Sequence, residues 1–91
     1  MKELNQEKVS QTITFLKQAI EINANTDHSV DVDLMGNWNQ VEIRVYDSKA
    51  VPLGNNLLFE SYDLQGESYD DEEKIDTIKT VLNNLTKSLL S

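Results

Sequence analysis

The single histidine of this 91-residue chain lies between an acid and a hydroxyl, in Asp27-His28-Ser29, and these are the residue types of a hydrolase triad. Triad members come from separate segments and converge in space, with the histidine between the other two. Adjacent residues at the entrance of a strand instead point to opposite faces. We therefore expect no catalytic residues, and we interpret the motif as a solvated loop that leads into a strand.

Metal and cofactor sites find little support in the residue types. The chain has no cysteine and no second histidine, so a transition-metal site would lack its usual ligands. Asp31 and Asp33 share one face of a predicted strand and residues 70–73 are consecutive acids, but neither pattern matches the calcium loop with its central glycine. We expect no metal and no cofactor. An enzyme would instead need a concave site whose carboxylates have shifted pKa values.

Negative charge is the most informative property of the chain. Sixteen Asp and Glu stand against eight Lys and Arg, for a net charge of -8. Residues 60–76 hold eight of these acids and one base, Lys74, a balance of -7, whereas residues 1–59 and 77–91 carry -3 and +2. Phosphate groups repel such a chain, so we expect no direct binding to nucleic acid or to an anionic membrane.

Two interpretations of this acidic segment, residues 60–76, stay open. Carboxylates in the first turn of a helix and lysines near its end stabilise the helix dipole, so residues 70–73 with Lys79 and Lys87 suit a solvated, solubilising helix. Two exposed carboxylates ~6 Å apart repel by roughly 0.7 kcal/mol in water, however, so crowding them costs stability. The dipole explanation leaves out three further acids: Glu60, Asp63 and Glu67.

The second interpretation is a binding surface for a basic protein. Residues of a helix rise by about 1.5 Å each, so residues 70–73 carry about one charge per 1.5 Å, close to the one charge per ~1.7 Å of duplex DNA. Tyrosine and tryptophan anchor many interfaces, and Trp38 falls in a predicted hairpin turn, although Trp38 and Tyr62 suit core or edge packing equally well. The expected partner-binding residues are Glu60, Asp63, Glu67, Tyr69, Asp70, Asp71, Glu72, Glu73, Asp76 and Trp38.

A helix over residues 5–23 begins the predicted fold. Asn5 is a suitable N-cap, and Asn23 begins a polar run that ends the helix. The main apolar stripe, within about 60° on a helical wheel, consists of Val9, Ile13, Leu16 and Ile20. A second set widens the apolar arc to about 180°: Phe15, Ala19 and Ile22. So broad an arc predicts two neighbours, a sheet and another helix. The alternative explanation of the broad arc is that the chain is a structural module that assembles as a homodimer.

Two strands with alternating apolar residues follow, over residues 30–34 and 41–45. Gly36-Asn37 suits a two-residue turn between them, and that turn places Asp31 opposite Glu42, a like-charge pair. In the alternative register, one strand is shifted by two residues relative to the other, and Asp31 lies opposite Arg44. The sequence leaves both registers open.

A third strand and a second helix complete the chain. Residues 47–56 form a loop, and residues 57–64 form a strand whose inward face the weak alternation leaves open. Asp70 and Glu73 fit a capping pair at the start of the final helix. Its apolar stripe consists of Ile75, Ile78, Leu82, Leu85 and Leu89. The order predicts a single domain over residues 1–91 with an α+β fold, α-β-β-β-α: a three-stranded antiparallel meander with both helices packed on one face.

The longest apolar run, Leu57-Leu58-Phe59, is far shorter than a membrane span or the apolar region of a signal peptide. Because the chain also lacks cysteine, we expect a cytoplasmic protein that does not contact a membrane. Its oligomeric state, monomer or homodimer, stays open.

By its element order, size and acidity, and with Ile43-Arg44-Val45 in its second strand after a short polar turn, the chain resembles the small acidic phage-encoded anti-CRISPR proteins. One type of that family runs helix, three-stranded antiparallel meander, helices, and places acidic side chains where an RNA-guided nuclease would hold target DNA. The resemblance implies a non-enzymatic inhibitor that occupies the nucleic-acid-binding surface of a basic partner. It carries over no individual residue, because no specific motif is shared.

Overall fold

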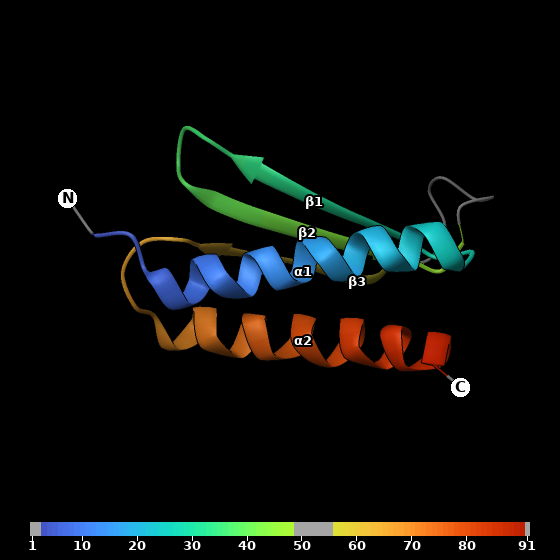
Figure 1. The fold of residues 1–91 in the computed structure, drawn as a ribbon. Coiled ribbons are helices and arrows are strands. Elements are labelled where there is room, and N and C mark those ends of the chain that lie inside the picture. The colour runs from blue at the N-terminus through green and yellow to red at the C-terminus, as the bar shows by residue number, and fades with distance from the viewer. Residues whose placement is uncertain (1–2, 49–55, 91) are drawn as a thin grey trace.

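The computed structural model describes residues 3–48 and 56–90. Its elements are α1 (Gln6–Asn25), β1 (Ser29–Met35), β2 (Gln40–Tyr46), β3 (Asn56–Asp63) and α2 (Tyr69–Leu90) (Figure 1). The strands form one antiparallel sheet in the order β1-β2-β3, and both helices cover the same face of it, α1 against β1 and α2 against β3. This arrangement confirms the predicted α-β-β-β-α fold of the α+β class.

The two helices run parallel to each other, side by side (Figure 1). Three antiparallel strands return the chain to the end at which α1 began, so α2 starts beside the start of α1. Both helix N-termini, each with its positive dipole end, therefore lie at one end of the molecule.

The hairpin of β1 and β2 adopts the register with the longer connection, in which Asp31 lies opposite Arg44. The two-residue turn is therefore wrong: residues 36–39 make the connection, and Asn39 takes the left-handed conformation with a φ of 49°. Arg44 explains the choice. In this register it lies opposite Asp31, forms an ion pair with Asp33, and places its Nε 3.6 Å from Glu42 Oε1, so one cation offsets three neighbouring acids.

The core lies between the helices and the inner face of the sheet. Its buried apolar residues are Phe15, Ala19, Ile22, Val30, Val41, Ile43, Val45, Leu58, Tyr62, Leu64, Ile78 and Leu82. On β3 the inner residues include Leu58 and Tyr62, while Leu57 and Phe59 are exposed on the outer face, which settles the orientation that the sequence left open. The loop expected at 47–56 falls largely outside the described residues.

Helix α1 turns a different side to the core than its main stripe predicts. Phe15, Ala19 and Ile22 are buried, and the Phe15 ring meets the Tyr62 ring edge-on at 6.4 Å between centroids. Three residues of the main stripe are exposed, Ile13 by 52%, Leu16 by 48% and Ile20 by 61%, whereas Val9 is partly buried against the core. The helix also continues to Asn25, because Thr26 caps it with two hydrogen bonds to the Ile22 carbonyl.

Helix α2 begins two residues earlier than an N-cap at Asp70 predicts. Its first turn starts at Tyr69, where the Glu72 N–H donates to the Ser68 carbonyl at 3.1 Å, so Asp70 lies inside the first turn and the expected capping pair of Asp70 and Glu73 is wrong. The predicted apolar stripe does face the core, with Ile78 and Leu82 buried. Leu89 belongs to the helix, but its side chain falls outside the described residues.

Candidate functional site

The end of the molecule at which both helices start is held together by Asn5. Its side-chain Oδ1 accepts from the Glu7 and Lys8 N–H groups, which confirms it as the N-cap of α1. Its backbone N–H donates to the Leu64 carbonyl at 2.8 Å, and its Nδ2 donates to the Gly66 carbonyl at 2.9 Å. Gly66 has a φ of 70°, a conformation that favours glycine. Asn5 thus joins the start of α1 to the turn that leads into α2.

A buried ion pair connects the first turns of the two helices. The Lys8 Nζ of α1 donates to Asp71 Oδ2 of α2 at 2.9 Å, and the two side chains are only 6% and 13% exposed. Lys8 and Asp71 occupy equivalent positions, the third residue of each helix. The pair therefore fixes the helices at the same axial level and neutralises one acid of the acidic segment from within.

A hydrogen-bonded chain continues from Lys8 into the core. The Thr12 hydroxyl donates to the Lys8 carbonyl at 2.8 Å, so the hydrogen bond between Thr12 and Tyr62 takes its proton from the tyrosine. Burial raises the pKa of Tyr62 above its usual value of 10.0, and the hydrogen bond to Thr12, which can turn to donate to a phenolate, opposes part of that rise. Tyr62 is thus a core residue, one of the two readings that the sequence left open.

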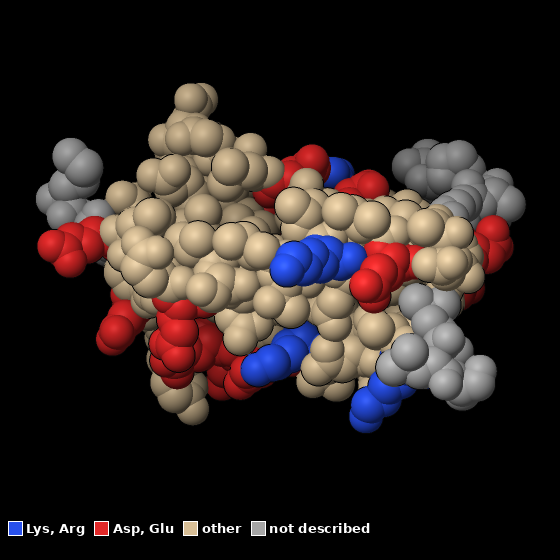
Figure 2. Space-filling view, in the orientation of Figure 1, with Lys and Arg blue, Asp and Glu red and all other residues tan. Residues whose placement is uncertain are grey.

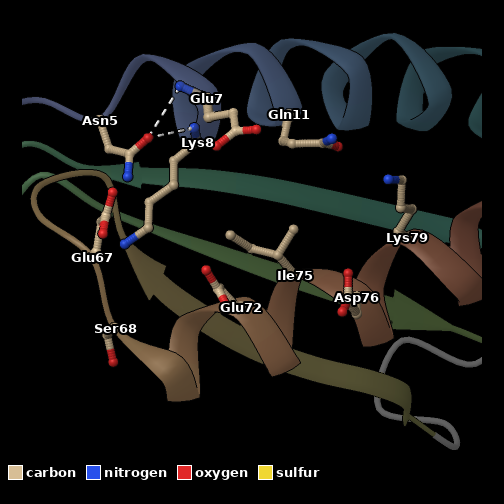
Figure 3. A pocket seen from close by; sticks show the side chains of 10 residues that line it. All are labelled: Asn5, Glu7, Lys8, Gln11, Glu67, Ser68, Glu72, Ile75, Asp76 and Lys79. Carbon is tan, nitrogen blue, oxygen red and sulfur yellow. Dashed lines mark hydrogen bonds between the residues drawn. The ribbon is translucent and has the colours of Figure 1, made fainter.

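An open groove of about 270 Å³ lies between the first turns of α1 and α2 (Figure 3). Figure 3 shows Lys8 extending from α1 toward the start of α2, and Ile75, Asp76 and Lys79 rising from α2. The lining residues are Asn5, Glu7, Lys8, Gln11, Glu67, Ser68, Glu72, Ile75, Asp76 and Lys79. We call this the acidic groove, because four of them are carboxylates.

The charge balance of the acidic groove is negative even after its lysines are counted. Asp71 offsets Lys8, so among the described lining residues Lys79 remains against four carboxylates, a balance of -3. Each helix N-terminus contributes about +0.5, so the two together supply about +1. Stabilisation of the helix dipoles therefore accounts for part of the negative charge, and about two charges remain in excess.

The residues predicted to bind a partner divide into several groups. Glu67, Glu72 and Asp76 line the acidic groove. Asp70 is exposed but lies about 160° around α2 from Glu72, because successive helical residues are rotated by about 100°. Glu73 is exposed on the solvent side. Consecutive acids on a helix therefore form a cluster around its start and not the row of charges that the spacing of DNA phosphates suggests.

Asp71 and the two acids of β3 do not join this cluster. Asp71 is the buried partner of Lys8 and is not accessible to another protein. Glu60 lies opposite Ile43, on the inner side of the sheet, and Asp63 accepts a hydrogen bond from the Gln65 N–H in the turn after β3. These three acids have structural surroundings that the sequence did not reveal.

Two exposed aromatic side chains lie at the same end of the molecule as the acidic groove. Tyr69, the first residue of α2, is 76% exposed, and Trp38, in the turn between β1 and β2, is 66% exposed. Figure 1 places this turn at the end where both helices start. Figure 2 shows acidic side chains gathered near that end, below the uncharged projection of the hairpin.

Sequence reasoning missed the contribution of α1 to the groove. Glu7, Lys8 and Gln11 line it although none was singled out. The signal was present in the spacing, because Lys8 precedes the buried Phe15 and Ile22 by one and two heptads and so lies on the core side of α1. A lysine in that position requires an acid nearby, and the acidic segment supplies one.

The Asp27-His28-Ser29 motif has other partners than those of a triad. Asp27 Oδ2 accepts from the Ser48 hydroxyl at 2.9 Å, and His28 Nδ1 lies 4.0 Å from Asp47 Oδ1.

Within residues 3–48 and 56–90, no three His, Asp or Glu side chains gather in a way that could hold a metal ion. Neither α1 nor the described length of α2 combines the length and apolar character needed to cross a membrane.

No protein-family model, curated protein or solved structure matches the chain.

Proposed function

We propose that this chain is a non-enzymatic inhibitor that binds a basic, nucleic-acid-binding protein and occupies the surface on which that protein holds nucleic acid. The observation that carries the proposal is the acidic groove, in which four carboxylates outnumber Lys79, the lining lysine that Asp71 does not offset. A cationic surface is the complement of such a site, and electrostatic attraction would accelerate the encounter.

The proposed docking surface is smaller and better defined than the acidic segment. It consists of Glu7, Glu67, Glu72 and Asp76 in the groove, with Tyr69, Asp70 and Glu73 around the start of α2 and Trp38 in the hairpin turn. Asp71 is left out, because its carboxylate is used by Lys8. Glu60 and Asp63 are left out because they lie on β3.

The exposed aromatic residues support a protein partner over a purely solubilising role. Carboxylates that only keep a chain soluble need no exposed aromatic neighbours, whereas tyrosine and tryptophan at the rim of a charged surface supply contact area that an interface needs. Tyr69 and Trp38 lie more exposed than Leu57 or Phe59, so the core gains little from either of them.

The partner class that follows is a protein with a lysine- and arginine-rich nucleic-acid channel. Its cationic side chains would exchange phosphate contacts for carboxylate contacts. An RNA-guided nuclease is the specific candidate, in keeping with the resemblance to anti-CRISPR proteins in element order, size and charge.

The experiment compares two variants of equal net charge. Glu72→Gln with Asp76→Asn removes two carboxylates from the acidic groove, and Glu21→Gln with Asp47→Asn removes two exposed carboxylates elsewhere. Affinity for an RNA-guided nuclease and for other basic DNA-binding proteins is measured at several salt concentrations. We expect the groove variant to bind about tenfold or more weakly, with a shallower salt dependence, and the control to bind as the wild type does. Equal affinities of the two variants would contradict the proposed surface.

A further inference from the structure

We propose that a second copy of this chain docks on the exposed side of α1, antiparallel to it, through the exposed Ile13, Leu16 and Ile20 and the partly buried Val9, which together we call the α1 stripe. This inference does not rest on the proposed function, because it concerns another surface. It also differs from the dimer that the width of the apolar arc suggested, since Phe15 and Ile22 are buried in the chain's own core.

The α1 stripe is turned away from α2. The side of α1 that faces α2 carries Lys8 and Gln18, which bond to Asp71 and to Asn83 Oδ1. Leu16 and Ile20 each lie two residues from Gln18, about 160° around the helix from it. The stripe therefore borders the free edge of the sheet at β1, where Leu34 is also exposed. Figure 2 shows uncharged atoms over much of α1, with basic and acidic side chains next to each other near its middle.

The spacing of the α1 stripe reads the same in both directions. Its steps are four, three and four residues, so reversing the helix superimposes the stripe on itself. A two-fold axis between residues 14 and 15 then sets Val9 of one copy opposite Ile20 of the other, and Ile13 opposite Leu16. Such self-complementarity is what an isologous interface requires. The seven-residue repeat, 9 to 16 and 13 to 20, is also the spacing of a helix–helix seam.

The charges along α1 permit this contact although the chain carries -8. The residues that border the stripe on its solvent side are Gln6, Ser10, Lys17, Glu21 and Ala24, so one lysine balances their one carboxylate. Glu7 lines the acidic groove and lies about 11 Å from the two-fold axis, measured along the helix. In an antiparallel dimer the acidic grooves of the two copies would therefore lie about 22 Å apart. That separation exceeds two Debye lengths at physiological ionic strength, and a parallel arrangement would bring the grooves together.

The available area predicts a weak dimer. The α1 stripe runs from residue 9 to residue 20, so it is about 17 Å long and, at a width of about 10 Å, offers roughly 170 Å² per copy in projection, and Leu34 extends it. Stable interfaces bury about 600 Å² or more per partner, so this contact belongs to the small, weak class. We expect dissociation constants in the micromolar range or above.

The first test is sedimentation of the full chain between about 5 µM and 1 mM. We expect the mass to rise from 10.4 kDa toward twice that value. Leu16→Glu should abolish the rise, whereas Phe59→Glu, a charge placed on an equally exposed residue of the outer sheet face, should leave it unchanged. Circular dichroism confirms that both variants fold. A mass of 10.4 kDa at every concentration overturns the proposal, and so does a dimer that Phe59→Glu disrupts and Leu16→Glu does not.

Cross-linking tests the orientation, and the absence of natural cysteine makes it clean. In the antiparallel dimer, Val9→Cys mixed with Ile20→Cys should form a mixed disulfide. Ile20→Cys alone should cross-link poorly, because residue 20 of one copy lies about 17 Å along the axis from residue 20 of the other. Efficient self-linking of Ile20→Cys with little mixed product would contradict the antiparallel arrangement.

Discussion

The buried ion pair between Lys8 and Asp71 predicts an asymmetric response to mutation. Replacing Asp71 by Leu leaves an ammonium group with little exposure in the first turn of α1, where the helix dipole disfavours a cation. Replacing Lys8 by Met leaves a carboxylate in the first turn of α2, where the dipole favours an anion. We therefore expect the loss of Asp71 to cost more than the loss of Lys8.

The magnitudes follow from the burial of each group. An uncompensated buried charge costs about 3–5 kcal/mol, so Asp71→Leu should lower the free energy of unfolding by about 3–4 kcal/mol. For Lys8→Met we expect about 1–2 kcal/mol, because the α2 N–H groups partly replace the lysine. The double variant removes both charges and should recover to within about 1 kcal/mol of the wild type. A domain of this size has a total stability of about 5–14 kcal/mol, so these effects are large.

The assay is urea denaturation of the four proteins in a double-mutant cycle. Glu73→Gln, an exposed acid on the same helix, serves as the control and should change the stability by less than about 0.5 kcal/mol. Additive single effects in the double variant, or a larger cost for Lys8→Met than for Asp71→Leu, would contradict this expectation.

Three further predictions concern the same end of the molecule. The raised pKa of Tyr62 means that folding favours its neutral form, so this stabilisation is complete below pH 10 and is lost as pH rises through the folded-state pKa. From about pH 9 to 11, the free energy of unfolding should therefore fall more steeply for the wild type than for Tyr62→Phe. Gly66→Ala should cost about 1–2 kcal/mol in thermal or urea unfolding because of its positive φ, whereas Gly36→Ala, which meets no atom within 4 Å, should be neutral or slightly stabilising. Asn5→Ala should cost about 1–2 kcal/mol by the same measurement, and a change below about 0.3 kcal/mol would mean that water replaces its cap.

Periodicity predicted the elements and their order but not the side that α1 turns inward. The apolar arc of α1 contains two overlapping sets, and nothing local distinguishes them. The choice depends on partners distant in sequence: Phe15 packs against Tyr62, and Lys8 reaches Asp71, only when α1 is rotated toward the second set. The hairpin register was likewise decided by Arg44, whose three acidic neighbours come from both strands.

The candidate site was predictable as a region and not as a set of side chains. The acids at 70–73 do lie at a helix start, but helical rotation sends Asp71 inward and separates Asp70 from Glu72. Glu7 entered the site only because three strands bring the starts of both helices together. This juxtaposition depends on the odd number of strands between the two helices. A count of charges along the chain gives no information about that number.

Displacement of nucleic acid from a basic protein would test the proposed docking surface directly. An RNA-guided nuclease carrying its guide and a fluorescent duplex target is titrated with the wild-type chain, with the groove variant (Glu72→Gln with Asp76→Asn) and with its equal-charge control (Glu21→Gln with Asp47→Asn). We expect the wild type and the control to release the duplex, the groove variant to release little of it, and all three to release less as salt rises. Binding of the chain without release of the duplex, or release by all three proteins alike, would contradict the proposal.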